Sequence, residues 1–126
     1  YENLNAILCM GTFPNLMDNH PMLDGYVFQI DGNFGAAAAM IEMLVKSKEN
    51  RIELLPAITE KTKSGCLSVR LRCGAELAMN WEDGKVIALE IYPDKILEEK
   101  WPVILCVNGT EHHILLERNV KFIDNY

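Results

Sequence analysis

The spacing of hydrophobic residues changes once along the chain, and the change separates two kinds of secondary structure. In the first fifty residues, apolar side chains recur three and four positions apart, which is the period of a helix. This spacing predicts one helix over residues 2–10 and another over residues 33–48. From Ile52 onward, apolar and polar residues alternate, most clearly over residues 67–72 and 77–81, and alternation predicts strands.

The second predicted helix is apolar on nearly every side. Apart from Glu42, its first three turns carry almost only Ala, Met, Ile, Leu and Phe, which indicates burial within a helical assembly or between two layers. The preceding residues 15–26 are rich in Asn, Asp, Pro and Gly and predict a loop. Because this loop also contains Leu16, Met17, Met22 and Leu23, we expect it to be packed down as a lid or as part of a site.

Two short motifs predict tight hairpins in the second part of the chain. Asp83-Gly84 and Asn108-Gly109 are dipeptides that favour two-residue hairpin turns. Asn108-Gly109-Thr110 also matches a glycosylation sequon, which we interpret as turn chemistry. The predicted fold class is therefore α+β, a short helical N-terminal part followed by an antiparallel, sandwich-like β domain. The break near Asn50 divides the chain into regions 1–50 and 51–126.

Composition narrows the possible partners. A 49% hydrophobic and 24% charged chain of 126 residues suits one globular domain or two small parts of a larger protein. The net charge of −6 and the scattered basic residues argue against a nucleic-acid partner. No apolar run is long enough to cross a membrane, and no signal peptide is visible, which leaves the compartment open.

The spacing of cysteines and histidines predicts no metal site. The four cysteines form no C-x-x-C pair, and we expect buried or half-buried thiols in a reducing compartment. His112 and His113 are neighbours in a predicted strand and would point to opposite faces. The segment G-N-F-G at residues 32–35 matches neither the dinucleotide fingerprint nor the P-loop, so we expect no cofactor.

Asp31 is the leading candidate for chemistry. It precedes a predicted buried helix, with Gln29 and Asn33 beside it, and a carboxylate in this position could hold or polarise a reacting water. The alternative is an aspartate that only caps the helix. His20 is a second candidate, with backbone hydrogen bonding as its alternative. Trp81 and Trp101 could stack on sugars, although a tryptophan in a strand more often belongs to the core.

Five motifs in a fixed order resemble one enzyme family. The chain contains N-L-M-D-N-H-P at residues 15–21, F-Q-I-D-G-N-F-G at 28–35, E-M-L at 42–44, I-E-L-L-P-A at 52–57 and W-E-D-G-K at 81–85. This set resembles the C-terminal part of glycoside hydrolase family 95. The family contains inverting α-L-fucosidases that act on α-1,2-linked fucose, and some members act on galactosides.

The resemblance implies both a fold and a mechanism. Residues 1–50 would hold the last helical hairpin of an (α/α)6 barrel, and residues 51–126 would form the β domain. In the family a glutamic acid protonates the leaving oxygen, and an asparagine polarised by an aspartate activates the water. Asp31 matches that catalytic aspartate, whereas His20, Gln29 and Asn33 match motif positions that we expect to bind substrate.

The same resemblance implies that the chain works as part of a larger enzyme. The general acid lies upstream of these motifs, so the chain alone should be inactive, with the missing N-terminal barrel and an oligosaccharide substrate as its partners. The chain departs from the family pattern at a loop beside the expected site and in the strand region. Residues 22–27 are inserted between H-P and F-Q, and the tryptophan usual after L-L-P-A is absent. The alternative function is a non-catalytic carbohydrate-binding or structural β module.

Overall fold

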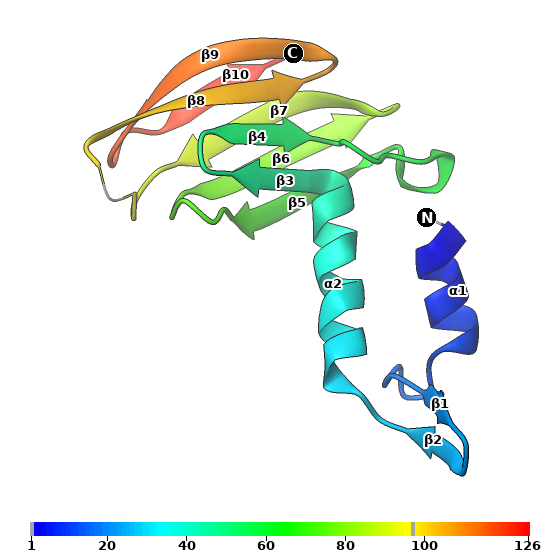
Figure 1. Ribbon diagram of the computed structural model, residues 1–126. Helices are drawn as coiled ribbons and strands as arrows, with labels where there is room; N and C mark the ends of the chain where they lie inside the picture. Colours follow the sequence, from blue (N-terminus) through cyan, green and yellow to red (C-terminus); the bar gives the residue numbers. More distant parts are fainter. Residues whose placement is uncertain (1, 97) are drawn as a thin grey trace. The chain divides into compact units, whose positions relative to one another are not determined.

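The computed structural model describes residues 2–96 and 98–126, and in it two helices and a small β-hairpin precede two larger β-sheets (Figure 1). The predicted α+β class is confirmed. The chain separates into two compact units, of which the first ends at Ile41 and the second begins at Glu42. We call them the helical unit and the β unit and describe each by itself. The predicted division into a barrel end and a β domain at residue 50 stays a prediction.

The helical unit contains α1 (Glu2–Met10), a small hairpin of β1 (His20–Met22) and β2 (Gly25–Val27), and most of α2 (Ile30–Leu44). The first helix has its predicted bounds. The hairpin corrects the prediction of a loop over residues 15–26, because a left-handed Gly25 (φ 132°) lets His20 pair with Val27. Neither helix of the described chain is long and apolar enough to span a membrane.

Helix α2 begins and ends earlier than the sequence predicts. Residues Val45–Lys48 form strand β3 instead of a last helical turn, so the predicted helix over residues 33–48 was wrong at both ends. Val45 continues the helical spacing, but its β-branched side chain also suits a strand, and pairing with β4 decides between them. The backbone N–H groups of Leu55 and Ala57 donate to the carbonyls of Leu44 and Met43, which satisfies the end of the helix.

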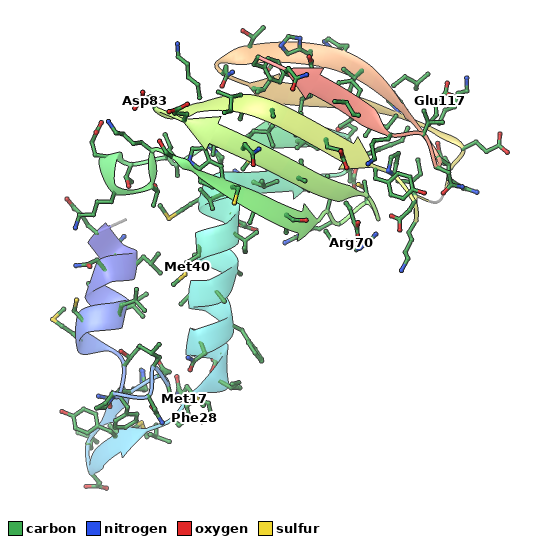
Figure 2. The ribbon with its side chains drawn as sticks, turned by 180° about the vertical axis from the view of Figure 1, so that it is seen from behind. Met17, Phe28, Met40, Arg70, Asp83 and Glu117 are labelled. Carbon is green, nitrogen blue, oxygen red and sulfur yellow. The ribbon has the colours of Figure 1, made fainter. Side chains whose placement is uncertain are left out.

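The expected burial of α2 is absent from this chain. None of the residues of α1 or α2 is buried, and Phe34 is 67% exposed. Phe28 and Met40 carry large apolar side chains in the same unit (Figure 2), and both are exposed. The helical unit therefore presents apolar side chains without a core of its own.

The β unit consists of two four-stranded sheets. One has the order β10-β7-β6-β5 and is wholly antiparallel, and the other has the order β3-β4-β8-β9. In the second sheet β4 and β8 run parallel, with Ile52 opposite Leu105. The strands are β3 (Val45–Lys48), β4 (Arg51–Leu54), β5 (Gly65–Arg70), β6 (Glu76–Glu82), β7 (Lys85–Tyr92), β8 (Lys100–Val107), β9 (Thr110–Glu117) and β10 (Phe122–Asn125).

The two sheets bury their facing sides in a single core. Alternate residues of β6 are buried along its length, and Leu77 and Met79 join one apolar cluster with Ile52 and Leu105 of the other sheet. A strand with one buried face needs this alternation. Because the cluster draws on both sheets, the β unit is a sandwich, as the sequence predicts. Trp81 lies in this core at 7% exposure, so its predicted alternative role as a sugar platform was wrong.

Both predicted hairpin turns are present. Asp83-Gly84 joins β6 to β7 and Asn108-Gly109 joins β8 to β9, with all four residues at left-handed φ values between 47° and 80°. The side chain of Asn108 also reaches β7, where its Oδ1 accepts from the N–H of Val86 (2.8 Å) and its Nδ2 donates to the carbonyl of Val86 (2.9 Å). The turn thus links the two sheets, which supports the interpretation of the sequon as turn chemistry.

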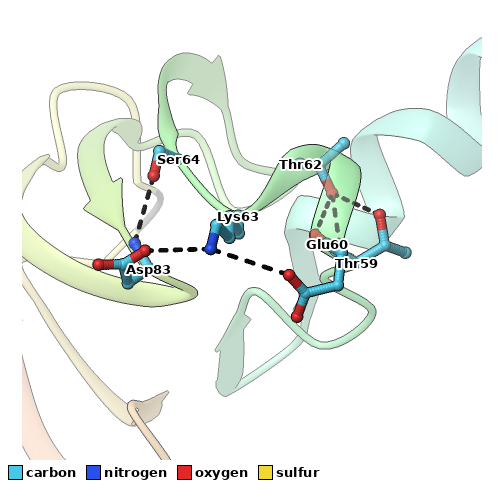
Figure 3. Close-up of polar contacts among 6 residues, drawn as sticks. All are labelled: Thr59, Glu60, Thr62, Lys63, Ser64 and Asp83. Carbon is cyan, nitrogen blue, oxygen red and sulfur yellow. Dashed lines mark hydrogen bonds and ion pairs between the residues drawn. The ribbon is translucent and has the colours of Figure 1, made fainter.

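The connection between β4 and β5 is fastened to the β6–β7 turn (Figure 3). It contains a short 3-10 helix, η1 (Glu60–Thr62), after which Lys63 Nζ lies 3.4 Å from Oδ1 of Asp83. The N–H of Asp83 donates to Oγ of Ser64, and the indole N–H of Trp81 donates to the carbonyl of Thr62 at 2.8 Å. These bonds hold the connection over the buried indole.

The cysteines are free, and two of them contradict the expected burial. Cys73 and Cys106 are partly buried, but Cys9 and Cys66 are exposed. Cys9 belongs to a helix that has no buried residues, and Cys66 lies on the outward phase of β5.

Candidate active site

Asp31 is the second residue of α2 and is exposed. A carboxylate is favourable in the first turn of a helix, because the unpaired N–H groups there carry partial positive charge. Its side chain makes no hydrogen bond or ion pair within the described residues, so it does not cap α2 by side-chain bonding. Asp31 is therefore an exposed carboxylate at the start of α2, and its side chain has no hydrogen-bond or ion-pair partner in the described chain.

Asn33 makes the polar contacts of this segment. Its Oδ1 accepts from the backbone N–H of Asp18 (2.8 Å), and its Nδ2 donates to the carbonyl of Leu16 (2.9 Å). Leu16 has a left-handed backbone (φ 64°), so the loop turns sharply where Asn33 holds it. The predicted substrate-binding residue thus fixes the loop that precedes His20.

Gly32 provides the space for a second carboxylate. A Cβ at residue 32 would lie 2.5 Å from Oδ1 and 2.7 Å from Cγ of Asp18, so only glycine allows this approach without a shift. Oδ2 of Asp18 is buried and has no hydrogen-bond partner in the described chain. Asp18 belongs to the N-L-M-D-N-H-P motif, and its D-x-H-P spacing was the sequence signal that could have singled it out.

His20 and Gln29 are less engaged. His20 is exposed in β1, opposite Val27, and Gln29 is exposed just before α2, where its backbone carbonyl accepts from the N–H of Gly32. Of the four predicted site residues, only Asn33 forms side-chain hydrogen bonds in the described part of the chain. The structure brings together Asn33, Gly32 and Asp18, and gives no side-chain contact among His20, Gln29 and Asp31.

The carboxyl groups whose pKa values are shifted lie elsewhere, in exposed ion pairs of the β unit. Hydrogen bonds from Arg70 (2.8 and 3.3 Å) hold the pKa of Asp94 below its usual range. Arg51 does the same for the pKa of Glu111, through a 2.6 Å hydrogen bond. Shifted pKa values occur at functional sites and in structural ion pairs alike. The Arg51–Glu111 pair joins β4 to β9 across β8, and the Arg70–Asp94 pair joins the end of β5 to the residues after β7, so we assign both pairs to the fold.

Two comparisons with known proteins relate the chain to an enzyme family. Residues 1–44 match the model of the glycosyl hydrolase family 95 catalytic domain, a range that includes Asp18, Asp31 and Asn33. Over 92 residues the chain is 34% identical to Alpha-L-fucosidase 2 of Arabidopsis thaliana. The match covers 71% of the chain and 10% of that protein, so the chain spans a small part of its relative. By its motifs, its family match and this relative, the chain belongs to glycoside hydrolase family 95.

Proposed function

We propose that the chain is the C-terminal part of an inverting α-L-fucosidase-like enzyme, in which Asp31 is one catalytic carboxylate. The observation that carries the proposal is the position of Asp31. It is exposed and unengaged in the first turn of α2, inside the segment matched by the family's catalytic domain. Fucosides are the proposed substrates, because the named relative is a fucosidase. Galactosides are the alternative substrates.

An inverting mechanism assigns Asp31 a limited task. Such enzymes place a general acid on one side of the glycosidic bond and activate a water on the other. In the proposed mechanism Asp31 accepts a hydrogen bond from an asparagine amide outside this chain, and the polarised amide orients the attacking water. Its free carboxylate oxygens are suited to this task, because no side chain of the described chain occupies them.

Asn33 and Asp18 have a positioning role in this proposal. Asn33 ties the loop of residues 16–18 to the start of α2, and the loop continues directly into His20. His20 and Gln29 are exposed beside this start and are free to contact a sugar. Residues 22–27, which include the tip of the β1–β2 hairpin, would form the rim that selects among sugars.

The remaining partner is the rest of a helical barrel. The helical unit exposes Phe34 at 67% and Leu23 fully, although water-exposed side chains of this size gain roughly 1.5–3 kcal/mol each when buried. Further helices packed on these side chains would bury them and would supply the general acid. We therefore expect the 126-residue chain by itself to release no product from an aryl α-L-fucoside.

The decisive experiment is Asp31→Asn in the complete enzyme that contains this chain. The substitution keeps the shape of the side chain and removes its charge, so kcat should fall by about 10²–10⁴-fold with unchanged folding. Glu2→Gln is the matched control, since Glu2 is an exposed carboxylate in the first turn of α1 and has no role in the proposed site. Turnover of the Asp31→Asn enzyme within a few-fold of wild type would reject a catalytic role.

A further inference from the structure

One end of the β sandwich is hollowed where three connections meet around Trp101. A cleft of about 870 Å³ is lined by the β3–β4 turn, the residues after β5 and the residues before β8. A second hollow of about 460 Å³ shares Asn50, Glu98 and Trp101 with the first and continues toward His113. All of these residues belong to the β unit. Together the hollows form a groove that passes along one indole, which we call the Trp101 groove.

Trp101 is placed to be both a core residue and a platform. It shares its strand face with Val103, Leu105 and Val107, which are buried, yet it is only half-buried at the start of β8. It packs against the core and also lines both hollows. Trp81 differs, since its indole is enclosed and its N–H is bonded to Thr62. Trp101 is thus the tryptophan whose ring a ligand can reach.

The groove offers hydrogen-bonding groups with free capacity. Ser47 lines it, and the hydroxyl oxygen of Ser47 is buried with no hydrogen-bond partner in the described chain. A buried hydroxyl without a partner is unfavourable, so a ligand group that reaches Ser47 would gain a hydrogen bond there. Asn50 adds an amide, and the guanidinium of Arg72, 82% exposed and 3.5 Å from Glu42, adds several donors.

The charges of the groove favour an uncharged ligand. Its lining includes the cations Lys48 and Arg72 and the anions Glu49 and Glu98, which balance. An anion would face two carboxylates and a cation would face two basic groups. A neutral polyhydroxylated molecule meets no such repulsion, and it combines apolar C–H faces with many hydroxyls. Pockets with an aromatic wall and a few polar groups in this volume range are typical of small-ligand sites.

We propose that the Trp101 groove binds a neutral oligosaccharide, with one sugar ring on the indole and hydroxyls bonded to Ser47, Asn50 and Arg72. This site is separate in sequence from Asp31 and takes no part in bond cleavage. It gives the β unit a binding function that does not depend on whether Asp31 is catalytic.

The test is a titration of the 126-residue chain with lactose and with 2′-fucosyllactose, followed by isothermal titration calorimetry, which does not use Trp101 as its reporter. A saturable change is expected, and Trp101→Ala should abolish it. Ser47→Ala should weaken binding roughly fivefold to tenfold, the value of one hydrogen bond, without lowering the thermal midpoint, because it removes an unpaired buried hydroxyl. Ser68→Ala, on an exposed position of β5, is the matched control and should bind as wild type.

Two further measurements keep the result interpretable. Cys73 lines the groove, and its half-buried thiol should react more slowly with iodoacetamide when sugar is bound. Anionic 3′-sialyllactose should bind more weakly than lactose. If circular dichroism shows that Trp101→Ala is unfolded, the Trp101→Phe and Ser47→Ala variants are used to test the site in its place.

Several outcomes would overturn the site. They are no saturable binding of either neutral sugar, unchanged affinity in folded Trp101 and Ser47 variants, and equal or tighter binding of sialyllactose. Asp31→Asn separates this proposal from the catalytic one, since it should leave sugar affinity in the groove unchanged.

Discussion

Both units of the chain are rich in apolar residues, but only one of them has a core. The buried hydrophobic side chains of the described residues all come from Val45 onward, and Leu77 and Ile52 are fully enclosed. The helices of the helical unit contain no buried residue. The β unit holds both halves of its core, because each sheet supplies an inner face to the other. Apolar spacing therefore shows which side chains need to be buried, but not whether the same chain buries them.

One aromatic side chain from each unit should differ strongly in its contribution to stability. Trp81→Ala removes a buried indole and its bond to Thr62, and should lower the free energy of unfolding of the β unit by about 3–5 kcal/mol. Phe34→Ala removes a side chain that is 67% exposed and should change stability by less than about 0.5 kcal/mol. Urea denaturation followed by circular dichroism measures both. Equal losses would mean that Phe34 is covered in solution, which would break the contrast.

A smaller effect on stability is expected from two glycines of α2. Substituting them tests whether the helical unit changes independently of the β unit. A Cβ at Gly35 meets nothing within 4 Å, so Gly35→Ala should stabilise the helix by about 0.5–1 kcal/mol. Gly32→Ala gains the same propensity, but its Cβ collides with the side chain of Asp18 and should displace the loop held by Asn33. Backbone amide NMR shifts of Asp18 should move in the second variant only.

The outcome that would contradict this pair is equally specific. If Gly32→Ala left the Asp18 amide resonance in place, the close packing of Asp18 on the helix start would not exist in solution. If Gly35→Ala raised the unfolding midpoint of the β sheets, the two units would unfold cooperatively. The two units would then differ in the burial of their side chains but not in their unfolding.

The smallest predicted effect is a dependence of stability on pH in the β unit. The hydrogen bonds of Arg70 lower the pKa of Asp94 from its ordinary value of 3.8, so their stabilisation is present above that pH. It is lost as the pH falls through the lowered pKa of the folded state. Arg70→Gln should therefore lower the thermal midpoint of the β unit by a few degrees at most at pH 7, and the difference should vanish well below pH 3.8. A difference that persists in acid would contradict the assignment.

The local parts of this fold follow from local sequence. The bounds of α1 and the turns at Asp83-Gly84 and Asn108-Gly109 depend on neighbouring residues, and the sequence predicts them. Strand β3 is different, because Val45 fits a helix until β4 pairs with it. The parallel register of β4 on β8 is likewise decided by packing between distant segments, which no local spacing encodes.

The candidate site divides in the same way. A motif with a carboxylate and an amide at a helix start identifies Asp31 and Asn33 from sequence alone. The contact of Asp18 with Gly32 requires the loop to fold back onto the helix, so its importance is visible only in three dimensions. The Trp101 groove is made of three connections that are far apart in sequence, and for this reason spacing could suggest the indole but not its surroundings.

The parallel pair of β4 and β8 also imposes an order in time. The antiparallel neighbours β5, β6 and β7 are joined by short turns and can pair as soon as they are made. Strand β4 must wait for β8, which follows all three, and closing that long loop costs entropy before any contact repays it. We expect pulsed hydrogen exchange during refolding to protect Leu77 before Ile52, so that one completed sheet serves as the surface on which the other is assembled.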